Sequence, residues 1–184
     1  MKKEWTLAIV FWGIALLLLF AISPIAGEEN LYQSVIRIHV LANSDSKEDQ
    51  DYKLLVRDQL LTYASEHFSH LSDVKEASQE IPKNFDAMQR VAQDALCEAG
   101  CTMPVELSLT EEYYPTRDYE SLSLPGGKYL SLQVKIGQAG GKNWWCVLFP
   151  PICLNTALDT EDALLEAGMN EENVKTVTDR KSVV

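Results

Sequence analysis

The sequence predicts an α+β fold, in which a mostly antiparallel sheet packs against two or three helices and an N-terminal hydrophobic export segment comes first. Segments with helical periodicity lie together between residues 47 and 99, and strand-like segments lie before and after them. The later strands are joined by short loops rich in glycine and polar residues, which is typical of antiparallel pairing. Grouped helices and grouped strands therefore favour the α+β class over an alternating α/β fold.

The N-terminus has the pattern of an export signal. Two lysines precede an unbroken apolar run, residues 5–22, which as a helix at ~1.5 Å per residue spans roughly 27 Å. Small residues follow the run, and the lysines before it should stay in the cytosol. We expect residues 1–27 to be a signal peptide or an N-terminal membrane anchor, with both alternatives open. Residues 28–168 then form an extracytoplasmic domain that meets the membrane only through the N-terminal segment.

The first strand of the domain is expected at residues 34–41. Its isoleucines and valine alternate with Arg37 and His39, which is the period-two pattern of a half-buried strand. The apolar side chains should face the core. We expect Arg37 and His39 to face solvent or a partner.

A polar segment, residues 42–51, follows this strand and marks the start of a helix. Ser46 and Asp49 approximate a capping box, and the clustered acids suit the positive end of a helix. The apolar positions then recur with a period near 3.6, which predicts a helix from about Lys47 to Phe68 with one buried stripe.

Two further helical segments are expected before the remaining strands. Residues 72–80 predict a short helix or helical turn that Pro82 interrupts. A second long helix is expected over residues 84–99, and Gly100 is a natural stop for it.

Three strands are expected in the second half, at residues 104–110, 128–136 and 144–149. Residues 111–124 predict a loop with a short edge strand. Residues 137–142 contain three glycines and predict a hairpin loop between the last two strands.

The segment GQAGGKNWWCVLFPPIC, residues 137–153, is the most unusual in the chain. Its strand is apolar on both alternating faces, which predicts a strand covered on both sides. Trp144 and Trp145 must then face opposite sides, so we expect one in the core and the other at an interface. Residues 159–167 predict a short helix, and residues 169–184 are polar and aperiodic and predict a loose tail.

The four cysteines are interpreted in the light of the expected export, because a thiol pair within reach tends to oxidise outside the cytosol. Three pairings are possible. We favour Cys97 with Cys101 and Cys146 with Cys153, because the members of each pair lie close in the sequence.

The charge balance excludes one class of partner. Lysine and arginine total 16 and aspartate and glutamate total 27, so the formal net charge is −11. An acidic chain without a basic cluster does not bind phosphate backbones, so nucleic acid is rejected as a partner.

Enzyme chemistry finds little support in the motifs. No phosphate loop, dinucleotide fingerprint, GxSxG or HExxH occurs. A cysteine hydrolase would use Cys146 as nucleophile, His39 as base and Asp45 as orienting group. Because Cys146 lies in an apolar strand close to Cys153, a structural disulfide is the better interpretation.

A metal site is the second chemical hypothesis. Asn43, Asp45, Asp49 and Asp51 offer hard oxygen ligands that would suit calcium, but their spacing does not match an EF-hand. A capped helix start explains the same residues better. We expect no metal, no cofactor and no catalytic residues.

Two segments resemble the stage II sporulation protein R (SpoIIR) family. They are SVIRIHVLANSDSKEDQDYKLLVRD, residues 34–58, and PGGKYLSLQVKIGQAGGKNWWCVLFPPIC, residues 125–153. The resemblance covers most of residues 34–153, but the pair Cys97 and Cys101 is not a feature associated with the family.

The resemblance implies a signalling role in an endospore-forming bacterium. Family members are made in the forespore and exported into the space between the two membranes, where they activate the mother-cell membrane aspartic protease SpoIIGA. That protease then processes pro-sigma-E to sigma-E. The candidate partner contacts in the two similar segments are Arg37, His39, Asn43, Asp45, Lys142, Asn143, Trp144 and Trp145. The alternative is an exported cell-wall hydrolase or glycan-binding module, whose aromatic side chains would stack on sugars.

Overall fold

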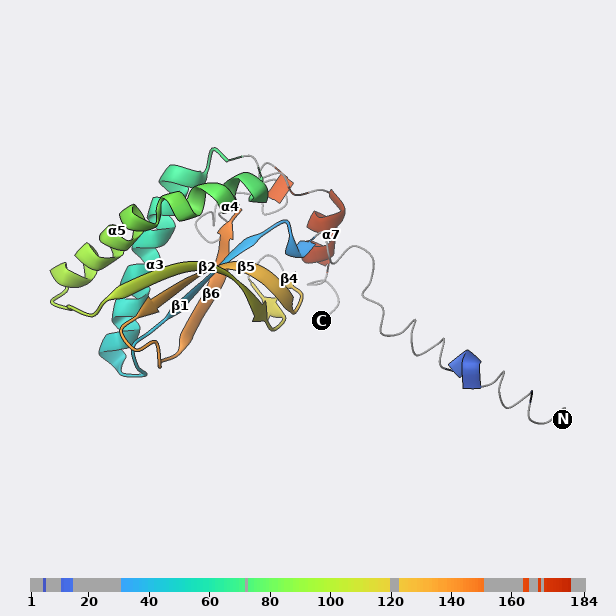
Figure 1. Ribbon diagram of the computed structural model, residues 1–184, viewed down its shortest axis with the longest axis horizontal. Coiled ribbons are helices and arrows are strands. Elements are labelled where there is room, and N and C mark those ends of the chain that lie inside the picture. Colours follow the sequence, from blue (N-terminus) through green and yellow to red (C-terminus); the bar gives the residue numbers. More distant parts are fainter. Residues whose placement is uncertain are drawn as a thin grey trace.

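The computed structural model describes residues 5, 11–14, 31–71, 73–119, 123–150, 164–165, 169 and 171–179. The elements follow the order β1 (Ile36–Leu41), α3 (Lys47–Phe68), α4 (Val74–Lys83), α5 (Phe85–Glu98), β2 (Val105–Tyr114), β3 (Arg117–Asp118), β4 (Ser123–Leu124), β5 (Gly127–Ile136), β6 (Asn143–Phe149) and α7 (Glu171–Asp179). The predicted α+β class is confirmed (Figure 1). Helix α3 begins and ends at the expected residues.

The main sheet is mixed. Its strand order is β2-β5-β1-β6, in which β1 runs parallel to β5 and antiparallel to β6, while β2 runs antiparallel to β5. The expected hairpin over residues 137–142 is therefore wrong, because β1 lies between β5 and β6. That connection crosses the end of β1 instead, and the N–H groups of Gly140 and Gly141 donate to the carbonyls of Asn43 and Ala42 at 3.1 and 2.9 Å.

One face of the sheet packs against α3, α4 and α5. The predicted apolar positions of β1 are fully buried there with β5 residues such as Leu132 and Val134 and helix residues such as Leu60 and Met88. Burial of this many aliphatic side chains is the main stabilising contribution, at about 1.5–3 kcal/mol for each large one. This core confirms the alternation predicted for β1.

The other face carries a second, smaller core, which the sequence did not predict. It gathers residues from five parts of the chain: Leu31, Val35, Tyr114, Leu124, Tyr129, Val147, Leu164, Met169, Val174 and Val177. Arg37 and His39 lie on this face and are buried, with 0% and 9% of their surfaces exposed. The expectation that they face solvent is therefore wrong, because distant segments cover this part of the sheet.

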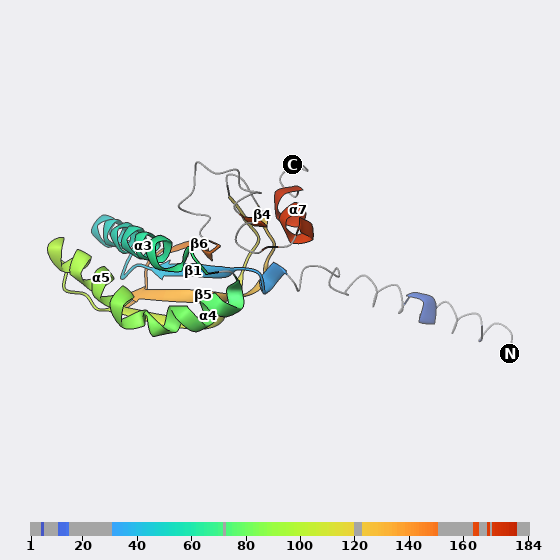
Figure 2. The ribbon, with the colours of Figure 1, turned by 90° about the horizontal axis from the view of Figure 1, so that it is seen from above.

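The expected loose tail contains a helix. Val174 and Val177 of α7 are buried in the second core, so residues 171–179 are held by packing. In Figures 1 and 2, α7 lies beside β4, at the opposite end of the sheet from the C-terminal end of α5. Glu171, Glu172 and Lys175 lie on the outer face of this helix, whereas the polar Asn173 is buried and donates to Ser34 Oγ at 3.0 Å.

Pro82 does not interrupt the short helix as expected. It lies in the last turn of α4, which continues to Lys83. A proline there removes a single N–H, and the helix ends at once because the N–H of Asn84 donates to the carbonyl of Ile81 at 3.0 Å. Helix α5 then begins at Phe85.

Strand β2 is longer than predicted. Residues 111–114 continue its antiparallel pairing with β5, so that Tyr114 pairs with Gly127. The region assigned to a loop therefore starts only at Pro115, and the two-residue strands β3 and β4 pair within it.

The predicted bridge between Cys97 and Cys101 is wrong, because both thiols are free. Gly100, with φ of +82°, turns the chain after α5, and the N–H of Cys101 donates to the carbonyl of Leu96 at 2.8 Å. This turn directs Cys101 into the core and leaves Cys97 exposed on the helix. Cys146 is buried and is not one of the free cysteines, but Cys153 lies outside the described residues, so their pairing stays a prediction.

The export segment lies mostly outside the described residues. Among those that are described, Trp5 and residues 11–14 are helical and exposed. No helix in the described part of the chain is long and apolar enough to cross a membrane.

Candidate recognition surface

The second face of the sheet brings together polar and aromatic side chains from all four strands. Arg37 and His39 come from β1, Glu112 from β2, Gln133 from β5 and Trp145 from β6. The register places His39 directly between Gln133 on one side and Trp145 on the other. We call these five residues the sheet-face cluster.

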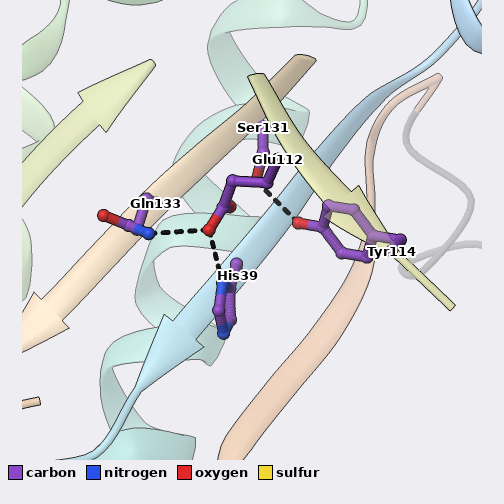
Figure 3. Close-up of polar contacts among 5 residues, drawn as sticks. All are labelled: His39, Glu112, Tyr114, Ser131 and Gln133. Atoms are coloured by element: carbon purple, nitrogen blue, oxygen red, sulfur yellow. Dashed lines mark hydrogen bonds and ion pairs between the residues drawn. The ribbon is translucent and has the colours of Figure 1, made fainter. Parts of the chain in front are cut away.

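His39 and Glu112 form the polar centre of this cluster (Figure 3). His39 Nδ1 lies 3.0 Å from Glu112 Oε1, and Gln133 Nε2 donates to the same oxygen at 2.7 Å. Burial would raise the pKa of the Glu112 carboxyl, but the polar neighbours Ser131, His39 and Gln133 outweigh it and hold the pKa below its ordinary value. Glu112 is therefore an ionised partner for His39 at neutral pH.

Arg37 lies under a group of tyrosine rings. Its Cζ atom is 4.0 Å from the ring centroid of Tyr114, 5.1 Å from that of Tyr129 and 5.8 Å from that of Tyr119. Its Nη2 donates a hydrogen bond to the Tyr119 hydroxyl. The aromatic faces provide a negative potential for the cation.

Tyr114 is fixed in this group by a second contact. Its hydroxyl is hydrogen-bonded to Ser131 Oγ at 2.6 Å, as Figure 3 shows. Burial raises the pKa of Tyr114, so it stays a neutral phenol. The Tyr114 ring that contacts Arg37 is therefore held in one position.

The two tryptophans point to opposite faces, as predicted. Trp145 is half-buried in the sheet-face cluster, with its ring 5.4 Å from that of His39, and the exposed Arg117 stacks on it at 4.3 Å. Trp144 is also half-buried and packs against the helical core, with Arg57 at 5.1 Å. Trp145 is therefore the tryptophan that belongs to the candidate surface.

Asn43 and Asp45 lie away from the cluster and hold two loops together. Asn43 Oδ1 accepts from the N–H of Gln138 at 2.9 Å, and Asp45 Oδ1 accepts from the N–H of Lys142 at 2.7 Å. The side chains of Lys142 and Asn143 themselves are exposed at the start of β6. Two of the expected contact residues thus have a clear structural role.

The predicted N-cap of α3 at Ser46 is confirmed, but the reciprocal bond of a capping box is not formed, because the N–H of Ser46 donates to Ser44 Oγ. Ser46 Oγ accepts from the N–H of Asp49 at 3.1 Å, while Asp49 Oδ2 accepts from Ser44 Oγ at 2.5 Å and Asn43 Nδ2 at 2.9 Å. These hydrogen bonds, with that from Ser44 contributing most, lower the pKa of Asp49. Among the described residues there is no group of acidic, histidine and cysteine side chains that would hold a metal ion.

The hypothetical hydrolase triad is not assembled. Cys146 pairs with Ile38 and packs in the helical core, whereas His39 lies on the other face of the sheet. Asp45 is bound to the backbone of Lys142. The three residues of that hypothesis therefore lie in separate places.

Glu112, Gln133 and Arg117 were missed as candidate site residues in the sequence. Residues 111–124 were assigned to a loop, which removed Glu112 from the sheet. The signal was available: Ser108, Thr110, Glu112 and Tyr114 continue the alternation of β2 without a break up to Pro115.

The family is shown by comparison with known proteins. The family model described as stage II sporulation protein R matches residues 32–159, which include every residue of the sheet-face cluster. The chain belongs to the stage II sporulation protein R family. The family's role is in sporulation.

A curated relative agrees with this assignment. The chain is 30% identical over 163 residues to the Stage II sporulation protein R of Bacillus subtilis (strain 168), an alignment that covers 83% of this chain and 71% of the relative. No solved structure gives a significant match.

Proposed function

We propose that the chain is an exported intercellular signal of endospore formation that activates the membrane aspartic protease SpoIIGA and so leads to processing of pro-sigma-E to sigma-E. The family match over residues 32–159 is the observation that carries the proposal. The protein would leave the forespore by means of residues 1–27 and act in the space between the two membranes. It would break no bonds of its own.

The side-chain chemistry of the described residues supports a binding role. His39 pairs with Glu112, and Cys146 lies on the opposite face of the sheet. Cys146 and His39 are therefore not arranged as a nucleophile and its base. Arginine and tryptophan, which stack at Arg117 and Trp145, are residue types enriched at the centres of protein interfaces. The sheet face is therefore better suited to recognition than to catalysis.

Activation requires that the signal prefer the active state of its receptor. A ligand shifts a conformational equilibrium only by its difference in affinity for the two states. A difference of about 3 kcal/mol shifts the equilibrium by a factor of about 150. We propose that docking of the sheet face on the outward part of the protease supplies this difference.

Reconstitution tests the proposal. The full-length chain, the membrane protease and pro-sigma-E would be produced together in a host that does not sporulate, and pro-sigma-E would be followed by immunoblot. Cleavage should require all three proteins. Cleavage that proceeds equally well without this chain would refute the proposal, and turnover of peptidoglycan by the purified chain would support the cell-wall enzyme instead.

A further inference from the structure

Arg37 is a buried cation that has no anionic partner among the described residues. Its exposed fraction is 0%, and none of the four ion pairs found in the described part of the chain includes it. One nitrogen, Nη2, donates to Tyr119. The other two, Nε and Nη1, are buried without a hydrogen-bond partner.

Such an arrangement is unfavourable for a side chain that serves only the fold. Buried charges in proteins are normally paired, and buried donors normally have acceptors. The tyrosine rings stabilise the charge of Arg37, but they offer no acceptor to Nε and Nη1 in the plane of the guanidinium. A ligand with acceptor oxygens would satisfy both the charge and the free donors.

The unpaired atoms of Arg37 belong to a larger group. His39 Nε2 and Glu112 Oε2 are also buried without partners, and all four such atoms found in the described residues lie in the sheet-face cluster. Residues 37 and 39 are successive positions on the same face of β1. The concentration of unused hydrogen-bonding capacity at one place indicates a site that is completed by another molecule.

We propose that Arg37 binds a carboxylate, which is supplied by an acidic side chain or the C-terminus of the receptor. This inference rests on the proposed function, since it names the chemistry by which the sheet face recognises its partner. The planar guanidinium matches a carboxylate in shape and charge. A phosphate dianion fits less well, because the ionised Glu112 lies in the same cluster.

Tyr119 is the residue that a carboxylate must displace. Its hydroxyl accepts a hydrogen bond from Arg37 Nη2, and its ring is only partly buried. It follows the two-residue strand β3, so few backbone hydrogen bonds hold it in place. Of the three tyrosine rings around Arg37, that of Tyr119 is the least buried, so it is the one that moves when a carboxylate takes the place of the phenol as acceptor.

Anion titration of the full-length protein tests the site directly. The probe is sodium acetate, with sodium chloride at equal ionic strength as control, and the readout is the arginine Nε–H resonance that disappears in Arg37→Met. This resonance should shift saturably with acetate and not with chloride. The absence of a saturable shift, or equal shifts with both salts, would overturn the proposal.

Tyr119→Phe keeps the ring and removes the competing hydroxyl, so it gives a test that does not depend on replacing a buried arginine. Acetate should bind this variant several-fold more tightly than the parent protein. Equal or weaker binding would show that Tyr119 does not compete for Arg37 and would contradict the proposed site.

The receptor is tested separately in the reconstituted system. Arg37→Met, once shown to be folded by its circular dichroism and urea midpoint, should lose most pro-sigma-E cleavage, while Arg90→Met, the same change at an exposed arginine of α5, should retain it. If the folded Arg37→Met variant signals normally, the carboxylate does not come from the receptor. If neither the unmodified protein nor Arg37→Met supports cleavage, the proposed function itself is wrong. The two failures are therefore distinguishable.

Discussion

The side chain of Asn43 fills the space that a Cβ atom at Gly137 would need. An ideal Cβ on Gly137 would lie 2.4 Å from Asn43 Oδ1, and Gly137 has φ of +57°, in the left-handed region. The same Asn43 oxygen accepts from the N–H of Gln138 at 2.9 Å. This contact joins the segments that follow β1 and β5, the parallel pair at the centre of the sheet, so both the shape and the backbone at this position favour glycine.

We predict that Gly137→Ala lowers the free energy of unfolding by about 1–3 kcal/mol, because the added methyl group strains the backbone and displaces Asn43. Urea unfolding followed by circular dichroism measures the change. Gly140→Ala is the matched control in the same loop, since its Cβ would lie 3.4 Å from the Asn43 carbonyl oxygen and its φ is not positive. Equal losses in the two variants would show that the Asn43 contact does not decide the effect.

Asp49 should make stability depend on pH. Its pKa is lowered in the folded state, chiefly by the hydrogen bond from Ser44, so its stabilising effect is present above its unfolded pKa and is lost as the pH falls through the lower folded pKa. Asp49→Asn should therefore lower the free energy of unfolding by about 1–2 kcal/mol at pH 7 and by less at pH 3.

Urea midpoints at pH 7, 5 and 3 check this expectation. Asp94→Asn is the control, because Asp94 is exposed on α5. A deficit of Asp49→Asn that stays constant from pH 7 to pH 3 would count against a role for the charge.

Local patterns were sufficient to predict α3, α4, α5 and the main core. Alternation in β1 identified its buried aliphatic face, and the 3.6-residue period identified both ends of α3, because these signals depend on neighbours in the sequence. The cap at Ser46 was predicted for the same reason. Each of these features is determined by residues that lie within a few positions of it in the sequence.

Features that depend on distant segments were not predicted. The glycines before β6 resemble a hairpin loop, but β1 enters between β5 and β6, and only the pairing of strands far apart in sequence shows this. Arg37 looked exposed because its neighbours alternate, yet Tyr114 and Tyr129 cover it from β2 and β5. The sequence therefore singled out Arg37, His39 and Trp145, which the structure brings to one face of the sheet, but their burial and contacts were not foreseen.

The cysteines should differ in reactivity. Cys97 is exposed and Cys101 is buried, and both are free. Maleimide should label Cys97 in the native protein within minutes, whereas Cys101 should react only after denaturation, because its sulfur is shielded from the reagent.

Peptide mapping without reduction should also find Cys146 joined to Cys153. A peptide in which Cys97 is linked to Cys101 would contradict the arrangement at the end of α5.

Arg117 offers a test of the recognition surface that leaves the fold intact. It is exposed, and its guanidinium stacks 4.3 Å from the ring of Trp145, so its loss removes a stacked arginine from the surface without opening a cavity. We predict that Arg117→Gln changes the free energy of unfolding by no more than about 0.5 kcal/mol. Cleavage of pro-sigma-E in the reconstituted system should nevertheless fall about fivefold or more, as expected when a contact worth about 1 kcal/mol or more is lost.

The matched control for this prediction is Arg90→Gln. Arg90 is an exposed arginine on α5, which packs on the other face of the sheet, so its replacement makes the same change in net charge away from Trp145. Cleavage with Arg90→Gln should equal that with the parent protein. If the two variants lower cleavage equally, the effect is one of overall charge, and the receptor does not bind the face that carries Trp145.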